Sequence, residues 1–197
     1  SAVHTNSSFS VSLSETTDGG VGISTSFMLA NETDTGLHTA GFTLTFTDGS
    51  KLDVLNAGNA AASHDVSVPG GAGKATGVTI TSTNTAQTGL DFFGVATGIG
   101  FEWHSASDFM ADGLKISASF SADDGVAADA STELDSSWGL GATYVTDAGD
   151  TALTIGAGLA DSTYKDSGTN PSNNSNGMHI GFSAVTGDLT VAAGYAD

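Results

Sequence analysis

The chain has 197 residues, of which 22 are acidic and only four are basic, giving a formal net charge of −18 at pH 7. Such a surface repels nucleic-acid phosphates, which argues against a nucleic-acid partner. The absence of cysteine excludes disulfides and thiolate chemistry. Apolar residues make up 39% of the sequence, enough for ordered structure despite the acidic excess. No run of 18 or more apolar residues occurs, so no transmembrane helix is expected.

Alternation of apolar and polar residues with a period of two recurs along the chain and predicts β-strands. In the first half, the predicted strands are Ser8–Ser14, Val21–Leu29, His38–Phe46 and Lys51–Asn56, with Val78–Ser82 as a further candidate. The dipeptides Asp18-Gly19 and Asp48-Gly49 lie between pairs of these segments. Such Asp-Gly pairs are typical of hairpin turns.

The second half repeats the pattern more regularly. The predicted strands are Ile99–His104, Leu114–Phe120, Trp138–Tyr144, Leu153–Leu159, Met178–Phe182 and Leu189–Tyr195. Together the two halves give about ten strands, or eleven with the further candidate. Each is expected to be near the length that a tilted strand needs to cross a bilayer.

The predicted connections alternate between short and long. Short turns fall near residues 15–20, 47–50, 146–151 and 186–188, and longer polar connections near 30–36, 56–77, 121–136 and 160–177. Outer-membrane barrels have short periplasmic turns and longer outer loops in this order. This alternation of short and long connections therefore predicts an all-β fold, an antiparallel transmembrane β-barrel.

The side of each predicted strand opposite the apolar residues carries mostly Ser, Thr, Gly and Ala, as in Gly139, Gly141 and Thr143. A soluble β-sandwich usually has Lys, Glu and Arg on its solvent face. Small uncharged residues instead suit a face that borders a water-filled lumen or packs closely. Glycine weakens a strand interior, and closure into a barrel would compensate for that cost.

Four stretches together resemble the trimeric general porins of alphaproteobacteria, of the Rhodobacter type. They are Ser8–Met28, Thr47–Ala62, Gly139–Ala160 and Met178–Asp197. No single motif is specific, and the resemblance rests on the cumulative pattern over most of the chain. It implies a sixteen-stranded barrel in the outer membrane of a Gram-negative bacterium, assembled as a homotrimer.

The resemblance also implies that the third outer loop folds inward and narrows the pore. His64, Asp65, Lys74 and Asp91 fall where that loop would lie. The family faces this loop with basic side chains, and this chain has no arginine to supply them. About ten strands are too few to close such a barrel, and Asp197 stands where the family has a terminal aromatic residue. The chain 1–197 is therefore expected to be a single barrel domain that lacks terminal strands.

The expected function is passive diffusion of small hydrophilic solutes and ions through a water-filled channel, with outer-membrane lipid as the surrounding partner. The acidic excess predicts preference for cations. No cofactor is expected. No constellation of nucleophile, acid and base points to an enzyme.

A second hypothesis is an acidic, calcium-binding β-protein that is secreted or forms a surface layer, as an adhesin or filament subunit does. Its calcium ligands would come from aspartates in the connections. The candidates are Asp123, Asp124, Asp161 and Asp166. This hypothesis explains the composition as well as the porin hypothesis does. It explains the alternating lengths of the connections and the low charge of the strands less well.

Overall fold

The computed structural model describes residues 8–30, 41–55, 58–66, 100–122, 134–164 and 175–196. These residues form ten strands and one short 3-10 helix, η1 (Ala62–His64). The strands are β1 (Ser8–Thr16), β2 (Gly22–Ala30), β3 (Phe42–Thr45), β4 (Lys51–Val54), β5 (Gly100–His104), β6 (Leu114–Ala122), β7 (Leu134–Ala148), β8 (Thr151–Tyr164), β9 (Ser175–Thr186) and β10 (Leu189–Ala196). The predicted all-β class and the number of strands are confirmed. Val78–Ser82, the further candidate strand, lies outside the described residues.

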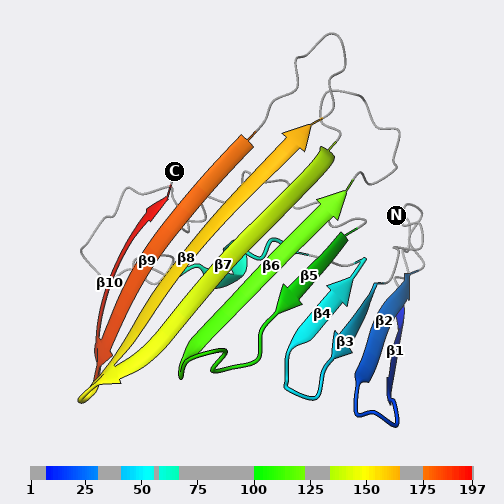
Figure 1. Ribbon diagram of the computed structural model, residues 1–197, viewed down its shortest axis with the longest axis horizontal. Helices are drawn as coiled ribbons and strands as arrows, with labels where there is room; N and C mark the ends of the chain where they lie inside the picture. Colours follow the sequence, from blue (N-terminus) through cyan, green and yellow to red (C-terminus); the bar gives the residue numbers. More distant parts are fainter. Residues whose placement is uncertain are drawn as a thin grey trace, which may run out of the picture.

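All ten described strands belong to one antiparallel sheet, and their order in the sheet is their order along the chain (Figure 1). The sheet is open, because β1 and β10 stand at its two edges in the strand order of the described residues. No helix in the described part of the chain is long and apolar enough to cross a membrane.

The connections differ in length at the two ends of the sheet. The short ones, at 17–21, 46–50, 105–113, 149–150 and 187–188, all lie at one end (Figure 1). The sequence that joins strands at the other end spans 31–41, 55–99, 123–133 and 165–174. The predicted alternation is therefore confirmed.

The turn between β3 and β4 illustrates how the Asp-Gly signal works. Gly49 adopts a φ of 87°, a value that few residues with a side chain tolerate. One carboxylate oxygen of Asp48 accepts hydrogen bonds from the backbone N–H of Ser50 at 2.9 Å and from its hydroxyl at 2.6 Å. These bonds stabilise the carboxylate and lower the pKa of Asp48.

One face of the sheet, called here the apolar face, exposes large apolar side chains from edge to edge. Its exposed members are Phe9, Leu13, Ile23, Phe101, Phe120, Trp138, Leu140, Tyr144, Ile155, Leu159, Met178, Ile180, Phe182, Val191 and Tyr195. The strand register places them in cross-strand rows. One row runs through Leu140, Leu159 and Met178 on β7, β8 and β9.

The opposite face, called here the polar face, carries serines, threonines and glycines and is partly covered by residues 58–66. The buried apolar residues of the described chain are Ala60, Ala61 and Ala160, and they lie where this segment meets the sheet. Among the buried polar residues are Glu102 and His179. The packing is thus the reverse of that in a soluble sandwich, with polar groups inside and large apolar ones outside.

Strand length departs from the prediction in one region. β3 and β4 have four residues each and β5 has five, so as described they are shorter than a bilayer-spanning strand. The expectation that every strand is long enough is wrong for β3 and β4, while β5 begins at Gly100 directly after residues outside the described ranges. The physical reason on the β4 side is a break at Leu55, which has a φ of 65° and directs the chain out of the sheet.

Glycines with positive φ at two short connections provide a test of the fold. Gly113 has a φ of 78°, and a Cβ there would collide with the carbonyl oxygen of Val145 on β7. We expect Gly113→Ala to cost about 3 kcal/mol of unfolding free energy, from backbone strain and the collision together. Gly149→Ala is the matched control, with a φ of 66° and no atom within 4 Å of the new Cβ. It should cost only about 1 kcal/mol of strain. Urea unfolding followed by tryptophan fluorescence measures both, and equal costs would contradict the described β6–β7 contact.

Candidate functional site

Residues 58–66, called here the inner segment, cross the polar face of the sheet. The segment follows the break at Leu55 and contains η1, which lies across β7 and β8 (Figure 1). It contacts side chains of β5, β6, β7 and β9 and the backbone of β8. One stretch of nine residues therefore links five strands.

Glycines on three strands allow the inner segment to lie directly on the sheet. They are Gly139, Gly141, Gly156, Gly158 and Gly181, on β7, β8 and β9. A Cβ at Gly139 would lie 2.6 Å from Oδ1 of Asn59, and one at Gly181 would lie 2.7 Å from Cβ of Val66. At Gly141 and Gly156 a Cβ would collide with His64. The glycines that weaken the strands are thus the ones that admit the segment.

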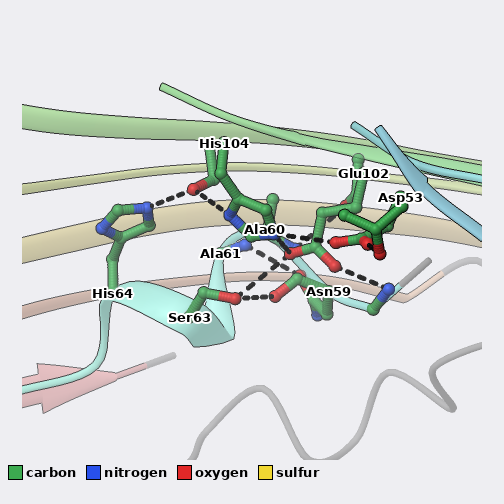
Figure 2. A network of polar contacts seen from close by, with 12 residues as sticks. Asp53, Asn59, Ala60, Ala61, Ser63, His64, Glu102 and His104 are labelled. Atoms are coloured by element: carbon green, nitrogen blue, oxygen red, sulfur yellow. Dashed lines mark hydrogen bonds and ion pairs between the residues drawn. The ribbon is translucent and has the colours of Figure 1, made fainter. Parts of the chain in front are cut away.

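Glu102 of β5 holds the beginning of the inner segment. Its carboxylate accepts a hydrogen bond from the backbone N–H of Gly58 at 2.6 Å and one from the hydroxyl of Ser63 at 3.2 Å (Figure 2). Glu102 is 5% exposed. A buried carboxylate is costly unless it is hydrogen-bonded, and two donors from the segment meet that need. Removing the segment would leave this carboxylate without them.

His179 of β9 holds the other side of η1. Its Nε2 lies 2.9 Å from the carbonyl oxygen of Ala61, and its Nδ1 lies 3.0 Å from a carboxylate oxygen of Asp65. Both partners are hydrogen-bond acceptors. His179 is buried, and its contact with Asp65 ties the segment to the sheet.

His64 occupies the centre of the contact. Its Nδ1 lies 2.6 Å from the hydroxyl oxygen of Thr143 on β7, and its Nε2 lies 2.8 Å from that of Ser117 on β6. Burial lowers the pKa of His64 to about 4, with smaller contributions from the positive charges of His104, His179 and Lys115. The imidazole is therefore neutral at pH 7, donating to one hydroxyl and accepting from the other.

The network continues from Ser117 to His104 on β5 and Asp53 on β4, and the latter two are labelled in Figure 2. The Ser117 hydroxyl also lies 2.8 Å from Nδ1 of His104. Nε2 of His104 is 3.6 Å from a carboxylate oxygen of Asp53 and 3.5 Å from one of Glu102. A chain of polar contacts thus runs from Asp53 on β4 through His104 and Ser117 to the inner segment.

The contacts among Ser117, His104 and Asp53 have the order of a hydrolase triad, but the geometry does not suit nucleophilic attack. Ser117 is 3% exposed and lies under His64, so a substrate has no access to its hydroxyl. The distance of 3.6 Å between His104 and Asp53 is also long for the orienting hydrogen bond of such a triad. The arrangement instead joins the inner segment to the sheet.

Two of the predicted constriction residues, His64 and Asp65, lie on the inner segment and contact the sheet. Lys74 and Asp91 lie outside the described residues. Glu102, His104 and His179 were not singled out from the sequence. Glu102 and His104 alternate with Phe101 and Trp103 on β5, and this charged pattern within a strand was the available signal.

The calcium candidates are not brought together in the described part of the chain. Asp161 lies on β8, at the end where the longer connections begin. Asp123, Asp124 and Asp166 lie outside the described residues. Within the described ranges, no three acidic or histidine side chains are arranged to hold a metal ion.

The chain was compared with protein families, curated proteins and solved structures. No protein-family model, curated protein or solved structure matches this chain.

A pair of neighbouring residues on β7 tests the glycine contact. In Gly141→Leu the new side chain would displace η1, because even a Cβ collides with His64 there. We expect the backbone amides of Ala60 and Ala61 to exchange hydrogen at least about tenfold faster, as expected when a local contact opens. In the control Ala142→Leu the side chain extends from the apolar face, and exchange of these amides should not change. Equal exchange in the two variants would contradict the close approach.

Proposed function

We propose that this chain is part of an outer-membrane porin, in which the apolar face contacts lipid and the polar face lines a water-filled channel. The observation that carries the proposal is the opposite character of the two faces. Large apolar side chains remain exposed on one of them, on β1, β2 and β5–β10. The other is polar and receives a segment of the same chain.

The exposed side chains of the apolar face favour contact with lipid over contact with water. Soluble monomers rarely expose a contiguous apolar patch larger than a few hundred Å², and here the exposed residues lie on eight strands, β1, β2 and β5–β10. Transmembrane barrels have this alternation, with apolar residues toward lipid and polar residues toward the lumen. β1, β2 and β6–β9 have nine to fifteen residues, enough to cross the hydrocarbon layer at a tilt.

Closure of the barrel needs strands in addition to the ten described. A sheet edge inside lipid would leave unpaired N–H and C=O groups, which cost several kcal/mol each. The porins that the chain resembles close with sixteen strands and assemble as trimers. We extend both features to this protein as part of the proposal.

The inner segment supplies the constriction in this proposal. Glu102 and His179 hold it on both sides. A segment fixed in this way narrows the channel to a constant width. His64 and Asp65 are on this segment, and Lys74 and Asp91 follow in the same connection between β4 and β5. The carboxylates around it are those of Asp53, Glu102 and Asp65, which lie beside the bases His104 and His179. Acidic side chains at a constriction favour cations.

Ion conductance in a planar bilayer tests the proposal. The protein, extracted in detergent, should produce stepwise conductance, and the reversal potential in a salt gradient should show cation preference. A protein that is soluble without detergent and produces no conductance in the bilayer would contradict the porin assignment. Assembly that depends on calcium would favour a surface-layer protein instead.

A matched pair of variants on β8 makes this test specific to the two faces. Ile155 is exposed on the apolar face, and Thr154 is its neighbour on the polar face. Ile155→Lys places a charge in lipid, at a cost of about 2–4 kcal/mol near the middle of the bilayer, and should reduce insertion and the number of channels. Thr154→Lys should leave insertion unchanged. Equal insertion of both variants would contradict the proposed orientation.

A further inference from the structure

We propose that His64 makes the attachment of the inner segment sensitive to pH, so that acidification from pH 6.5 to pH 5 loosens η1 from the sheet and widens the channel. The widening rests on the proposed porin function. The loosening rests only on the contacts of the inner segment with the sheet.

Polar contacts, more than apolar burial, hold the inner segment. Only small apolar side chains, those of Ala60, Ala61 and Ala160, are buried in the described chain. Alanine methyl groups bury little apolar surface and therefore contribute little hydrophobic stabilisation. The segment therefore depends on its hydrogen bonds to Glu102, Ser119, Thr143, Ser117 and His179. A change in the charge of one of these groups affects a large part of the attachment.

The surroundings of His64 disfavour its protonated form. Its two ring nitrogens face the hydroxyl groups of Ser117 and Thr143, which carry no negative charge to offset that of a protonated ring. The ionisable groups on the strands around it that act on its charge are His104 on β5, Lys115 on β6 and His179 on β9, and all three are bases. A proton added to His64 would face these three bases in a buried place.

The carboxylates near the network are directed mainly to other partners. Asp53 and Glu102 contact His104, on the far side of Ser117 from His64. Asp65, which follows His64 on the inner segment, contacts His179. These carboxylates hold the other two histidines, which leaves His64 as the histidine with hydroxyl partners at both nitrogens.

The sign of the pH effect follows from the two states of His64. When the segment is detached, the imidazole has the ordinary histidine pKa of about 6.5. When the segment is attached, its pKa is lowered to about 4. The attached state therefore binds fewer protons, so its stability is complete above pH 6.5 and is lost as the pH falls toward 4.

The contact of His179 with Asp65 is a second polar attachment of the segment, beside that of His64. Between pH 6.5 and pH 5 we expect His64 to determine the response, because its lowered pKa opposes protonation over the whole of this range. Carboxylates in water stay mostly ionised down to pH 5, so the range also limits their contribution.

Hydrogen exchange of the Ala60 and Ala61 amides, at pH 6.5 and pH 5 and corrected for the intrinsic rate at each pH, tests the inference. After allowance for solvent screening, we expect roughly fivefold less protection at pH 5 in the intact protein in detergent. The amides of β8 should not change. Unchanged protection of Ala60 and Ala61 would overturn the inference.

Two variants separate titration of His64 from simple weakening. His64→Gln keeps a donor and an acceptor but cannot titrate in this range, so the loss of protection at pH 5 should disappear. Ser63→Ala removes the hydrogen bond to Glu102, so protection should fall equally at both pH values while the pH dependence remains. The same pH dependence in His64→Gln as in the unmodified chain would overturn the inference. If His64→Gln does not fold, NMR titration of the His64 ring in the unmodified chain decides: a pKa near 6.5 would overturn the inference.

Channel conductance at the two pH values separates this inference from the proposed function. A larger conductance step at pH 5 in the unmodified chain, and not in His64→Gln, supports both. Loss of protection without any conductance supports the pH response and contradicts the porin. Conductance together with unchanged protection supports the porin and contradicts the pH response.

Discussion

The close approach of the inner segment to the glycines of β7, β8 and β9 is the constraint on which the rest of this structure depends. A side chain at Gly141 or Gly156 would collide with His64, so the segment reaches the sheet only because these positions have none. Glycine in a strand interior costs stability, and the hydrogen bonds of the segment to Glu102 and His179 offset part of that cost. Once the segment lies there, Ser117 and Glu102 become buried and acquire the partners that buried polar groups need.

The same constraint explains why the two faces of the sheet differ so strongly. Small residues on the polar face leave room for a segment of chain and for water, but they provide almost no apolar surface to bury. Most of the large apolar side chains, such as those of Trp138, Leu159 and Phe182, are on the other face, where the described chain leaves them exposed. The stability of such a sheet must come largely from its backbone hydrogen bonds and from whatever covers the apolar face, and in the function we propose lipid covers it.

Much of the fold was predictable from the sequence, because alternation along strands and Asp-Gly turns are local signals. The β6–β10 meander and its register follow from them directly, and Asp48-Gly49 forms the turn expected of it. The site was only partly predictable. A family resemblance pointed to His64 and Asp65, but the pairing of His64 with Ser117 joins residues 53 positions apart. The short lengths of β3 and β4 also escaped prediction, because the break at Leu55, with its φ of 65°, is not at a glycine or proline.

The central claim is that the apolar face lies in lipid, and tryptophan fluorescence tests it most directly. The chain has two tryptophans, and Trp138 is 47% exposed on the apolar face. Trp103→Phe would leave Trp138 as the single reporter in protein reconstituted into vesicles. The account predicts strong quenching by lipids brominated on their acyl chains and weak quenching by acrylamide in the water. Strong quenching by acrylamide and none by the brominated lipids would contradict it, and the apolar face would then be a surface covered by protein.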